Sequence, residues 1–169
     1  MKRPALAWLA ALTVVVASPT AVAESDDAQV VLGLADQALH FINEEDAIGL
    51  TDLMLEEAVV FTGLERPEGQ LIRVTTRAQH REQAIEGDLV ERGFDPEVKV
   101  SGSVAMVWYP YDLYVDGAWI HCGVDIFNFV KTDQGWRIAT IVWSGDQPPS
   151  CALHPDGPPA GATGTPQAG

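Results

Sequence analysis

The dipeptide Asp116-Gly117 constrains the fold of this chain more than any other feature of its sequence. It joins two long runs, residues 103–115 and 118–131, in which large apolar side chains alternate with other residue types. Asp-Gly between two such runs is the strongest short-range signal for a β-hairpin with a two-residue turn. We therefore predict a long antiparallel hairpin in which Val115 pairs with Ala118.

Regular elements are also predicted on both sides of the hairpin. Residues 26–43 carry apolar side chains at helical spacing, and Asp46 can cap a second helix over 47–55. Thr76 and Gln79 form the pattern of a capping box, which starts a third helix that should end before Gly93. The remaining predicted elements are strands, and they cover residues 58–64, 70–74, 97–102 and 136–144. This order predicts an α+β domain in which a curved antiparallel sheet wraps around three helices.

The predicted register of the hairpin sorts its side chains onto two faces, because alternate residues of a strand point to opposite sides. Counting outward from the turn, Asp112 lies opposite His121, and Trp108 lies opposite Asp125. This first face combines aromatic and ionisable side chains, whereas the second is almost entirely apolar. The second face holds Val107, Tyr109, Tyr111, Leu113, Ile120, Cys122, Val124 and Ile126. A β-bulge between the turn and His121 would undo this register, and Pro110 makes one possible.

Neither face has the polar composition of a sheet surface that faces water, so we expect both to be covered. The second face would be covered by another copy of the chain, in a homodimer formed through the outer face of the sheet. The first face would line a cavity under the helices, since ligand pockets are mostly apolar with a few convergent polar groups. The residues predicted to line this pocket are Trp108, Asp112, Tyr114, Trp119, His121, Asp125, Phe127 and Trp143. For Trp143, the register of the last strand leaves the choice of face open.

The N-terminus has the three parts of a secretory signal. Lys2 and Arg3 precede an apolar run over 5–17, and Ala21 and Ala23 form a cleavage site. The run is shorter than the roughly 20 residues that a membrane span needs, so we expect cleavage and no membrane segment afterwards. The predicted organisation is a signal peptide (1–23), one domain (24–152) and a disordered Pro/Gly-rich tail (153–169). Such a protein would be secreted or periplasmic.

Charge and cysteine content narrow the range of partners. The formal net charge is −14, and removal of the signal would make it more negative, so nucleic acid is not an expected partner. Cys122 and Cys151 are the only cysteines, and in an oxidising compartment they can form a disulfide or stay as two thiols. Their spacing fits neither a redox motif nor a zinc site, and we predict no cofactor.

The order of elements and two stretches of sequence suggest a known fold. Residues 46–63 (DAIGLTDLMLEEAVVFTG) and 121–144 (HCGVDIFNFVKTDQGWRIATIVWS) resemble the nuclear transport factor 2-like superfamily, which includes SnoaL-like proteins, ketosteroid isomerases and dehydratases. The resemblance covers most of residues 28–145. It implies a cone of curved sheet and helices around an internal pocket, commonly as a dimer.

The resemblance also implies a role for one residue. Asp125 looks like the pocket aspartate of the isomerases, whereas the positions of their base and their helical tyrosine fall near Thr62 and Ala38. Without a base and a phenol at these positions, steroid isomerisation is not supported. The fold hosts many reactions and also proteins that catalyse none.

His121 and Asp125 are the two candidates for acid–base chemistry. With Asp112 opposite, His121 would have a raised pKa, whereas burial among aromatic rings would raise the pKa of Asp125. A structural pair of Asp112 and His121 is the alternative. These two lack a third ligand, so we predict no metal site, and we expect His80 to be solvated.

Three functions remain open at this point. The leading hypothesis is an exported protein that binds a small apolar or aromatic ligand in its cavity. The second is a SnoaL-like enzyme, an isomerase, dehydratase or cyclase, with Asp125 or His121 as general acid or base. The third is an interaction module that uses the outer sheet face and no pocket. The ligand and the reaction cannot be read from the sequence.

Overall fold

The computed structural model describes residues 19–66, 68–83, 87–148, 150 and 154–163. Its helices are α1 (Pro19–Asn43), α2 (Ala47–Asp52) and α3 (Arg77–Arg81). Its strands are β1 (Met54–Arg66), β2 (Gly69–Thr76), β3 (Leu89–Gly93), β4 (Glu97–Ser101), β5 (Val104–Val115), β6 (Ala118–Thr132) and β7 (Gly135–Gly145). The predicted α+β class is confirmed.

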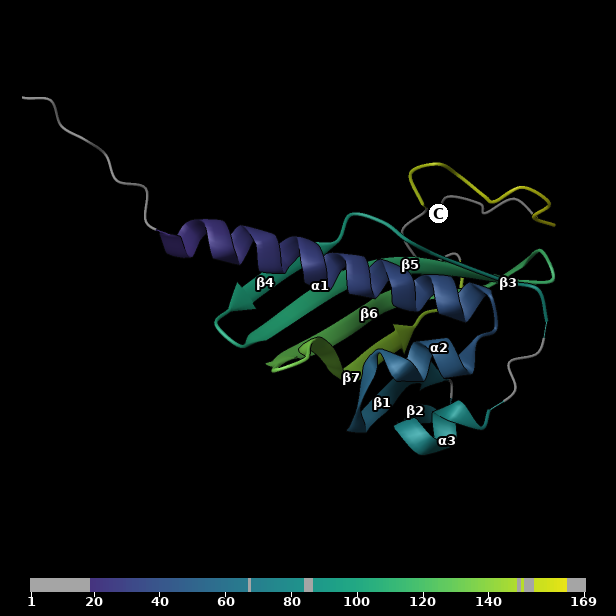
Figure 1. The fold of residues 1–169 in the computed structure, drawn as a ribbon. Coiled ribbons are helices and arrows are strands. Elements are labelled where there is room, and N and C mark those ends of the chain that lie inside the picture. The colour runs from purple at the N-terminus through teal and green to yellow at the C-terminus, as the bar shows by residue number, and fades with distance from the viewer. Residues whose placement is uncertain (1–18, 67, 84–86, 149, 151–153, 164–169) are drawn as a thin grey trace, which may run out of the picture.

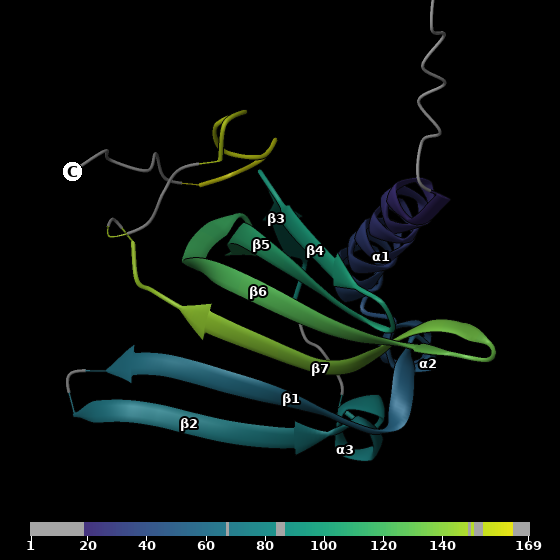
Figure 2. The same ribbon diagram turned by 90° about the vertical axis from the view of Figure 1, so that its left-hand side faces the viewer.

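The strands form one curved, open sheet that the helices cover on one side (Figures 1 and 2). The strand order is β2-β1-β7-β6-β5-β3, and β4 also pairs with β5. All neighbours are antiparallel except β1 and β7, which run parallel. The helix α1 lies against β3, β4 and β5, while α2 contacts α1 and α3 contacts β1. The concave side of the sheet and the helices therefore enclose the core.

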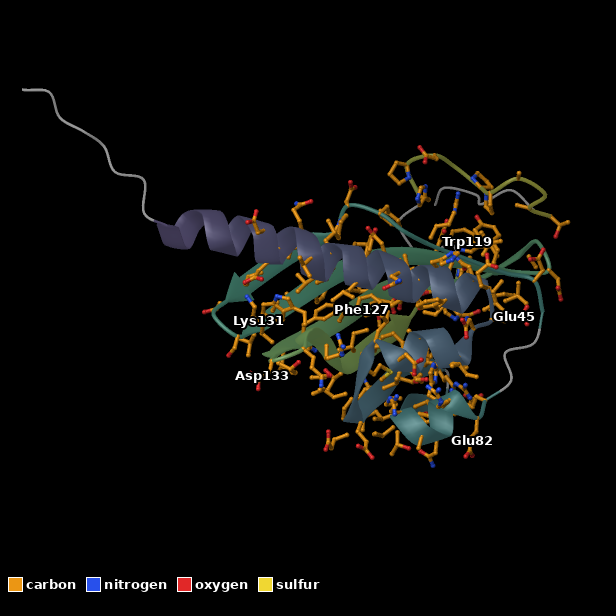
Figure 3. All side chains as sticks on the ribbon, viewed as in Figure 1. Glu45, Glu82, Trp119, Phe127, Lys131 and Asp133 are labelled. Carbon is orange, nitrogen blue, oxygen red and sulfur yellow. The ribbon has the colours of Figure 1, made fainter. Side chains whose placement is uncertain are left out.

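The apolar stripe of α1 supplies one wall of this core. Val31, Ala35 and Ala38 repeat at helical spacing and are fully buried against the sheet. From the sheet side, Val107 and Phe127 meet them in the same cluster, and Figure 3 labels Phe127 near the middle of the sheet. The small side chains of α1 allow the helix to lie close to these larger ones.

Hydrogen bonds that acidic side chains of α1 accept from the sheet fix the helix along its length. Near its start, Asp27 accepts hydrogen bonds from Lys131 Nζ at 2.7 Å and from Trp136 Nε1 at 2.9 Å. Further along, Asp36 accepts a hydrogen bond of 2.8 Å from the Tyr109 hydroxyl. Because these donors come from β5, β6 and β7, the helix is held in one position over the sheet.

The two sequence signals for turns and caps are confirmed. Asp116 and Gly117 have φ values of 51° and 76°, as the two-residue turn requires, and Val115 pairs with Ala118. Thr76 and Gln79 form the capping box of α3. However, α3 ends at Arg81, so the longer third helix is wrong, and part of that segment forms β3 instead.

A segment predicted to lie in a disordered tail contacts the domain. Residues 154–163 fold back onto the β5–β6 hairpin, where Thr163 N–H donates a 2.7 Å hydrogen bond to the Gly117 carbonyl oxygen. The ring of His154 meets the edge of Phe94 with 5.3 Å between centroids. The expected signal peptide falls mostly, and Cys151 entirely, outside the described residues. No helix among the described residues is long and apolar enough to cross a membrane.

Candidate functional site

A cavity of about 170 Å³ lies between the sheet and all three helices, toward the turn end of the β5–β6 hairpin. Its apolar lining residues are Ile42, Leu50, Val60, Leu113 and Ile141. Its polar and aromatic lining residues are His80, Glu91, Tyr111, His121, Asp125 and Trp143. The cavity thus combines an apolar body with a small group of titratable side chains, as ligand pockets commonly do.

A β-bulge at Ile120 decides which side chains of the hairpin reach this cavity. The pairing changes from Tyr114 opposite Trp119 to Leu113 opposite His121, so Ile120 is the extra residue. From there to the end of the hairpin, every residue of β5 faces one position further along β6 than the regular register predicts. The predicted pairs Asp112–His121 and Trp108–Asp125 are therefore wrong.

The bulge places the predicted pocket residues of β5 on the outer face of the sheet. Trp108 pairs with Ile126 and is 39% exposed there. Asp112 is buried on the same face, where both of its carboxylate oxygens accept hydrogen bonds from the guanidinium of Arg92. The partner of Asp112 is therefore Arg92, and not His121.

The aromatic side chains next to the turn also lie away from the cavity. Tyr114 and Trp119 stack on each other with 6.3 Å between ring centroids, and Arg92 lies over the Tyr114 ring. Figure 3 shows Trp119 near the C-terminal segment. Phe127 shares the inner face with Asp125, but it is fully buried in the core and does not line the cavity.

Three of the predicted site residues meet in the cavity: His121, Asp125 and Trp143. Trp143 on β7 pairs directly with Asp125 on β6. This pairing results from a second β-bulge at Ala139, which shifts the register of β7 by one residue. The ring of Trp143 stacks on that of His121, with centroids 5.5 Å apart and planes 12° apart. The indole therefore forms a wall that connects the two titratable residues.

The carboxyl groups of Asp125 and Glu91 hydrogen bond to each other inside the cavity. Asp125 is 5% exposed, and apart from the Glu91 carboxyl no group of the described residues pairs with its Oδ2. Burial raises the pKa of Glu91 to about 7 and raises the pKa of Asp125 well above its ordinary value. The raised pKa predicted for Asp125 is confirmed. Near neutral pH the pair holds a proton, with Asp125 as the donor and Glu91 as the acceptor.

Backbone contacts position Glu91 for this pairing. The Asn43 side chain, at the end of α1, accepts a 2.6 Å hydrogen bond from the Glu91 N–H and donates a 2.9 Å bond to its carbonyl oxygen. Within the sheet, Glu91 on β3 pairs with Leu113 on β5, and Leu113 pairs with His121 on β6. The end of α1 and the sheet together hold the Glu91 side chain toward the cavity.

The contact with Tyr111 determines which ring nitrogen of His121 carries the proton. The Tyr111 hydroxyl donates a 2.8 Å hydrogen bond to the Ser144 carbonyl oxygen and lies 3.0 Å from His121 Nδ1. Because the phenol has one proton and the carbonyl can only accept, the second contact requires the proton on Nδ1. The Nε2 atom of His121 then carries a free lone pair.

Burial lowers the pKa of His121, so the imidazole is neutral near neutral pH. The sequence predicted a raised pKa from an Asp112 contact, and this expectation is wrong because Asp112 lies on the other face. The cavity therefore contains a neutral imidazole with a basic nitrogen and a carboxyl pair that can release a proton. Such a combination can accept a proton at one point of a ligand and donate one at another.

Glu91, Tyr111 and His80 were not predicted as cavity residues. Glu91 lies in a segment that was predicted to be helical, and Tyr111 was assigned to the outer face by the register without a bulge. His80, expected in solvent, lines the cavity and has a pKa lowered by burial. Residues 89–93 are Leu-Val-Glu-Arg-Gly and lack the alternation of a half-buried strand, so no signal in the sequence indicated that Glu91 points inward.

Comparison with known proteins identifies the fold. No protein-family model and no curated protein matches the sequence. Among solved structures, a nuclear transport factor 2-like protein of unknown function from Pseudomonas putida is 14% identical with a TM-score of 0.59, over 80% of this chain and 98% of that one. The chain has the nuclear transport factor 2-like fold.

Two further structures agree with this nuclear transport factor 2-like fold. A nuclear transport factor 2-like protein with a cystatin-like fold from Novosphingobium aromaticivorans is 13% identical with a TM-score of 0.60, over 79% of this chain and 89% of that one. A ketosteroid isomerase-like protein from Erwinia carotovora is 17% identical with a TM-score of 0.55, over 73% and 98%. At these identities the comparison shows the fold and no particular activity.

The structure places the two residues, Thr62 and Ala38, that the resemblance equated with the base and the tyrosine of the isomerases. Thr62 is buried beside Trp143 across β1 and β7, and Ala38 is fully buried on the side of α1 that faces the sheet. Neither side chain is a general base. Among the described residues, no group of three or more His, Cys, Asp or Glu side chains could hold a metal ion.

Proposed function

We propose that the chain binds a small, largely apolar ligand in the cavity, with Asp125 as its main polar contact. The observation that carries this proposal is the buried Oδ2 atom of Asp125, to which no described residue donates a hydrogen bond. A buried polar atom without a partner costs free energy, and a ligand that supplies a hydrogen bond would remove this cost.

The size of the cavity limits the ligand. A volume of about 170 Å³ is close to that of a known protein cavity of about 150 Å³ that binds benzene. One aromatic or aliphatic ring with a few further atoms would fill it. A fused four-ring steroid would not fit without rearrangement of the lining side chains.

A thermal-shift screen of single-ring compounds tests this proposal with two matched variants. Trp143→Ala removes a wall of the cavity, whereas Trp108→Ala removes the same side chain from the outer face. We expect compounds that raise the Tm of the wild type and of Trp108→Ala, with a smaller effect on Trp143→Ala. Absence of any binder, or equal shifts in both variants, would contradict the proposal.

An enzyme that moves a proton on its ligand is a second candidate function. It is favoured by the different protonation states of the two cavity groups, a free Nε2 on His121 and a proton on the carboxyl pair of Asp125 and Glu91. Neighbouring groups whose environments push their pKa values apart are typical of acid–base sites. The reaction class would be an isomerisation or a dehydration.

Proton exchange from solvent distinguishes this enzyme from a binding protein. A bound ligand with an acidic C–H next to a carbonyl group should take up deuterium from D₂O, as seen by mass spectrometry. His121→Ala and Asp125→Asn should abolish the uptake while the fold remains intact by circular dichroism. Binding without uptake in the wild type would leave the binding function and exclude the enzymatic one for that ligand class.

A homodimer through the outer sheet face is supported by a row of apolar side chains. Trp108, Ile126, Val142, Phe61 and Val74 lie opposite one another on neighbouring strands, in that order across the sheet. Trp108, Phe61 and Val74 are 39%, 36% and 50% exposed. Apolar side chains in one continuous row favour contact with a second copy.

Sedimentation velocity tests the homodimer with Trp108→Asp. We expect a dimer mass for the wild type and a monomer mass for the variant. A monomeric wild type would contradict the homodimer. Neither result bears on the cavity ligand. With a monomeric wild type, the exposed row would serve a different partner, as in the interaction module.

Export and the disulfide belong to the same proposal. Cleavage after Ala23 would place the start of the mature chain at Glu24, inside the region that α1 occupies. In the secreted or periplasmic compartment, Cys122 would then pair with Cys151. Intact-mass spectrometry of the exported protein tests both: the expected mass is that of residues 24–169 less two hydrogens, and an uncleaved chain would contradict the proposal.

A further inference from the structure

The two carboxyl groups of the cavity have no cationic partner within it. No Lys or Arg is among the described residues that line the cavity, and Arg92, next to Glu91 in sequence, points to Asp112 on the opposite face. His80 and His121 line the cavity, but burial lowers the pKa of each and keeps it neutral. The carboxyl pair therefore sits in a low-dielectric site without a counter-charge.

Aromatic rings lie beside this pair. Trp143 lines the cavity next to Asp125, as its pairing partner on β7, and Tyr111 lines it from β5. The faces of such rings attract cations through their quadrupole, most strongly for tryptophan. Carboxylates and aromatic rings in one small cavity are a combination that favours a positively charged organic group.

We infer that the polar group of the ligand is a protonated amine, held by the carboxyl groups of Asp125 and Glu91 next to the aromatic ring of Trp143. This inference rests on the proposed ligand-binding function and adds the chemical class of the ligand. An ammonium group has three N–H donors, which is enough to reach Asp125 Oδ2, to which no described residue donates, and a Glu91 oxygen together.

Other ligand classes fit the site less well. A carboxylate would add a third acidic group beside two others, and their repulsion would oppose binding. A hydroxyl has one proton and can satisfy one of the two acceptors. A carbonyl can only accept a hydrogen bond from the pair, so it leaves the two carboxyl groups without a counter-charge. The ammonium supplies both the donors and the charge.

Proton release accompanies binding of such a ligand. In the empty cavity the pair holds a proton, and an ammonium favours the pair in its fully ionised form, so that proton leaves to solvent. The titratable groups that face the pair are Tyr111 on β5, His121 on β6 and His80 on α3, and α1 presents Ile42 and Asn43 there. Asp112 acts on Glu91 from the other face of the sheet. Affinity should therefore rise with pH through the titration of Glu91.

Isothermal titration calorimetry with three ring compounds of nearly equal size tests the inference. The compounds are benzylamine, benzyl alcohol and benzoate, measured at about pH 8, where the amine is still protonated. We expect benzylamine to bind about tenfold or more tightly than benzyl alcohol, and benzoate not to bind. Lowering the pH to about 5 should reduce the preference for the amine.

Two conservative variants and one control locate the effect. Asp125→Asn and Glu91→Gln should each remove the preference for benzylamine and keep the affinity for benzyl alcohol. Glu57→Gln, an exposed acid of β1, should leave it unchanged. Equal or weaker binding of benzylamine in the wild type would overturn the amine inference and leave the binding function standing. Failure of all three compounds would overturn both.

Discussion

The carboxyl group of Glu91, on β3, hydrogen bonds with that of Asp125, on β6, although 33 residues separate the two positions in the chain. The β5 strand lies between β3 and β6, and its Tyr111 is flanked by Gly93 and Gly123 on the neighbouring strands. A Cβ atom at Gly93 would meet the Tyr109 ring, and one at Gly123 would meet the Ser144 carbonyl oxygen, so both positions need glycine for the strands to pack here. Stability, binding and any proton transfer in the cavity all depend on the contact between the two carboxyl groups.

Stability should therefore fall as the pH rises. Burial raises the pKa of Glu91 from 4.5 to about 7, so the folded state holds a proton that the unfolded state releases. The protonated pair contributes stability fully below about pH 4.5, and this contribution is lost as the pH rises through 7. Glu91→Gln should gain on the order of 2 kcal/mol relative to the wild type between about pH 5 and pH 8, measured by urea unfolding. An equal pH dependence in the two proteins would contradict the contact.

Tyr111→Phe should destabilise the protein and change the state of His121. The variant leaves the Ser144 carbonyl oxygen and His121 Nδ1 without the phenol, at a cost of about 1–2 kcal/mol. In the wild type, ¹⁵N NMR at neutral pH should show a protonated Nδ1 and an unprotonated Nε2 on His121. Tyr114→Phe, on the outer face, should leave these signals unchanged. A His121 protonated on Nε2 in the wild type would contradict the assignment.

Gly123→Ala should be one of the most destabilising small substitutions in the sheet. A Cβ atom there would lie 2.1 Å from the Ser144 carbonyl oxygen, which is the acceptor of Tyr111. The backbone of β7 would have to shift, at a cost of about 2–3 kcal/mol, and the Tyr111 contact would be lost with it. Gly63→Ala is the matched control, because its Cβ would be 3.9 Å from the nearest atom. Equal Tm values for the two variants would contradict this geometry.

Asp112→Ala separates the outer face from the cavity. It leaves the Arg92 guanidinium without its buried partner, so it should cost about 3–5 kcal/mol of stability. Ligand binding to the remaining folded protein should be unchanged at about pH 8, where Glu91 is mostly ionised in both proteins, since Asp112 does not line the cavity. A loss of affinity with little loss of stability would support the original sequence prediction of a pocket role for Asp112.

The sequence predicted what depends on local pattern. The positive φ values of Asp116 and Gly117 and the capping box of Thr76 follow from the conformational preferences of those residues, and both are confirmed. The inward position of Asp125 also followed from the resemblance. In each case a short stretch of chain contains the physical cause.

The errors come from features that only packing decides. Pro110 made a bulge between the turn and His121 possible, but nothing in the sequence placed one at Ile120. This one residue moves Trp108 and Asp112 to the outer face and brings Tyr111 inward. Glu91 lies in a stretch with good helix formers, and its strand forms because β5 and Asn43 supply the backbone partners. Tertiary hydrogen bonds outweigh local propensity at this position.

NMR of the tryptophan indole groups tests the central claim most directly. Trp143 lies in the cavity opposite Asp125, and Trp108 lies on the outer face at the same level of the sheet. Titration of ¹⁵N-tryptophan-labelled protein with benzylamine should shift the Trp143 indole signal in a saturable way, and Asp125→Asn should weaken this response. The Trp108 signal should stay in place. A saturable shift of Trp108 without one of Trp143 would contradict the account.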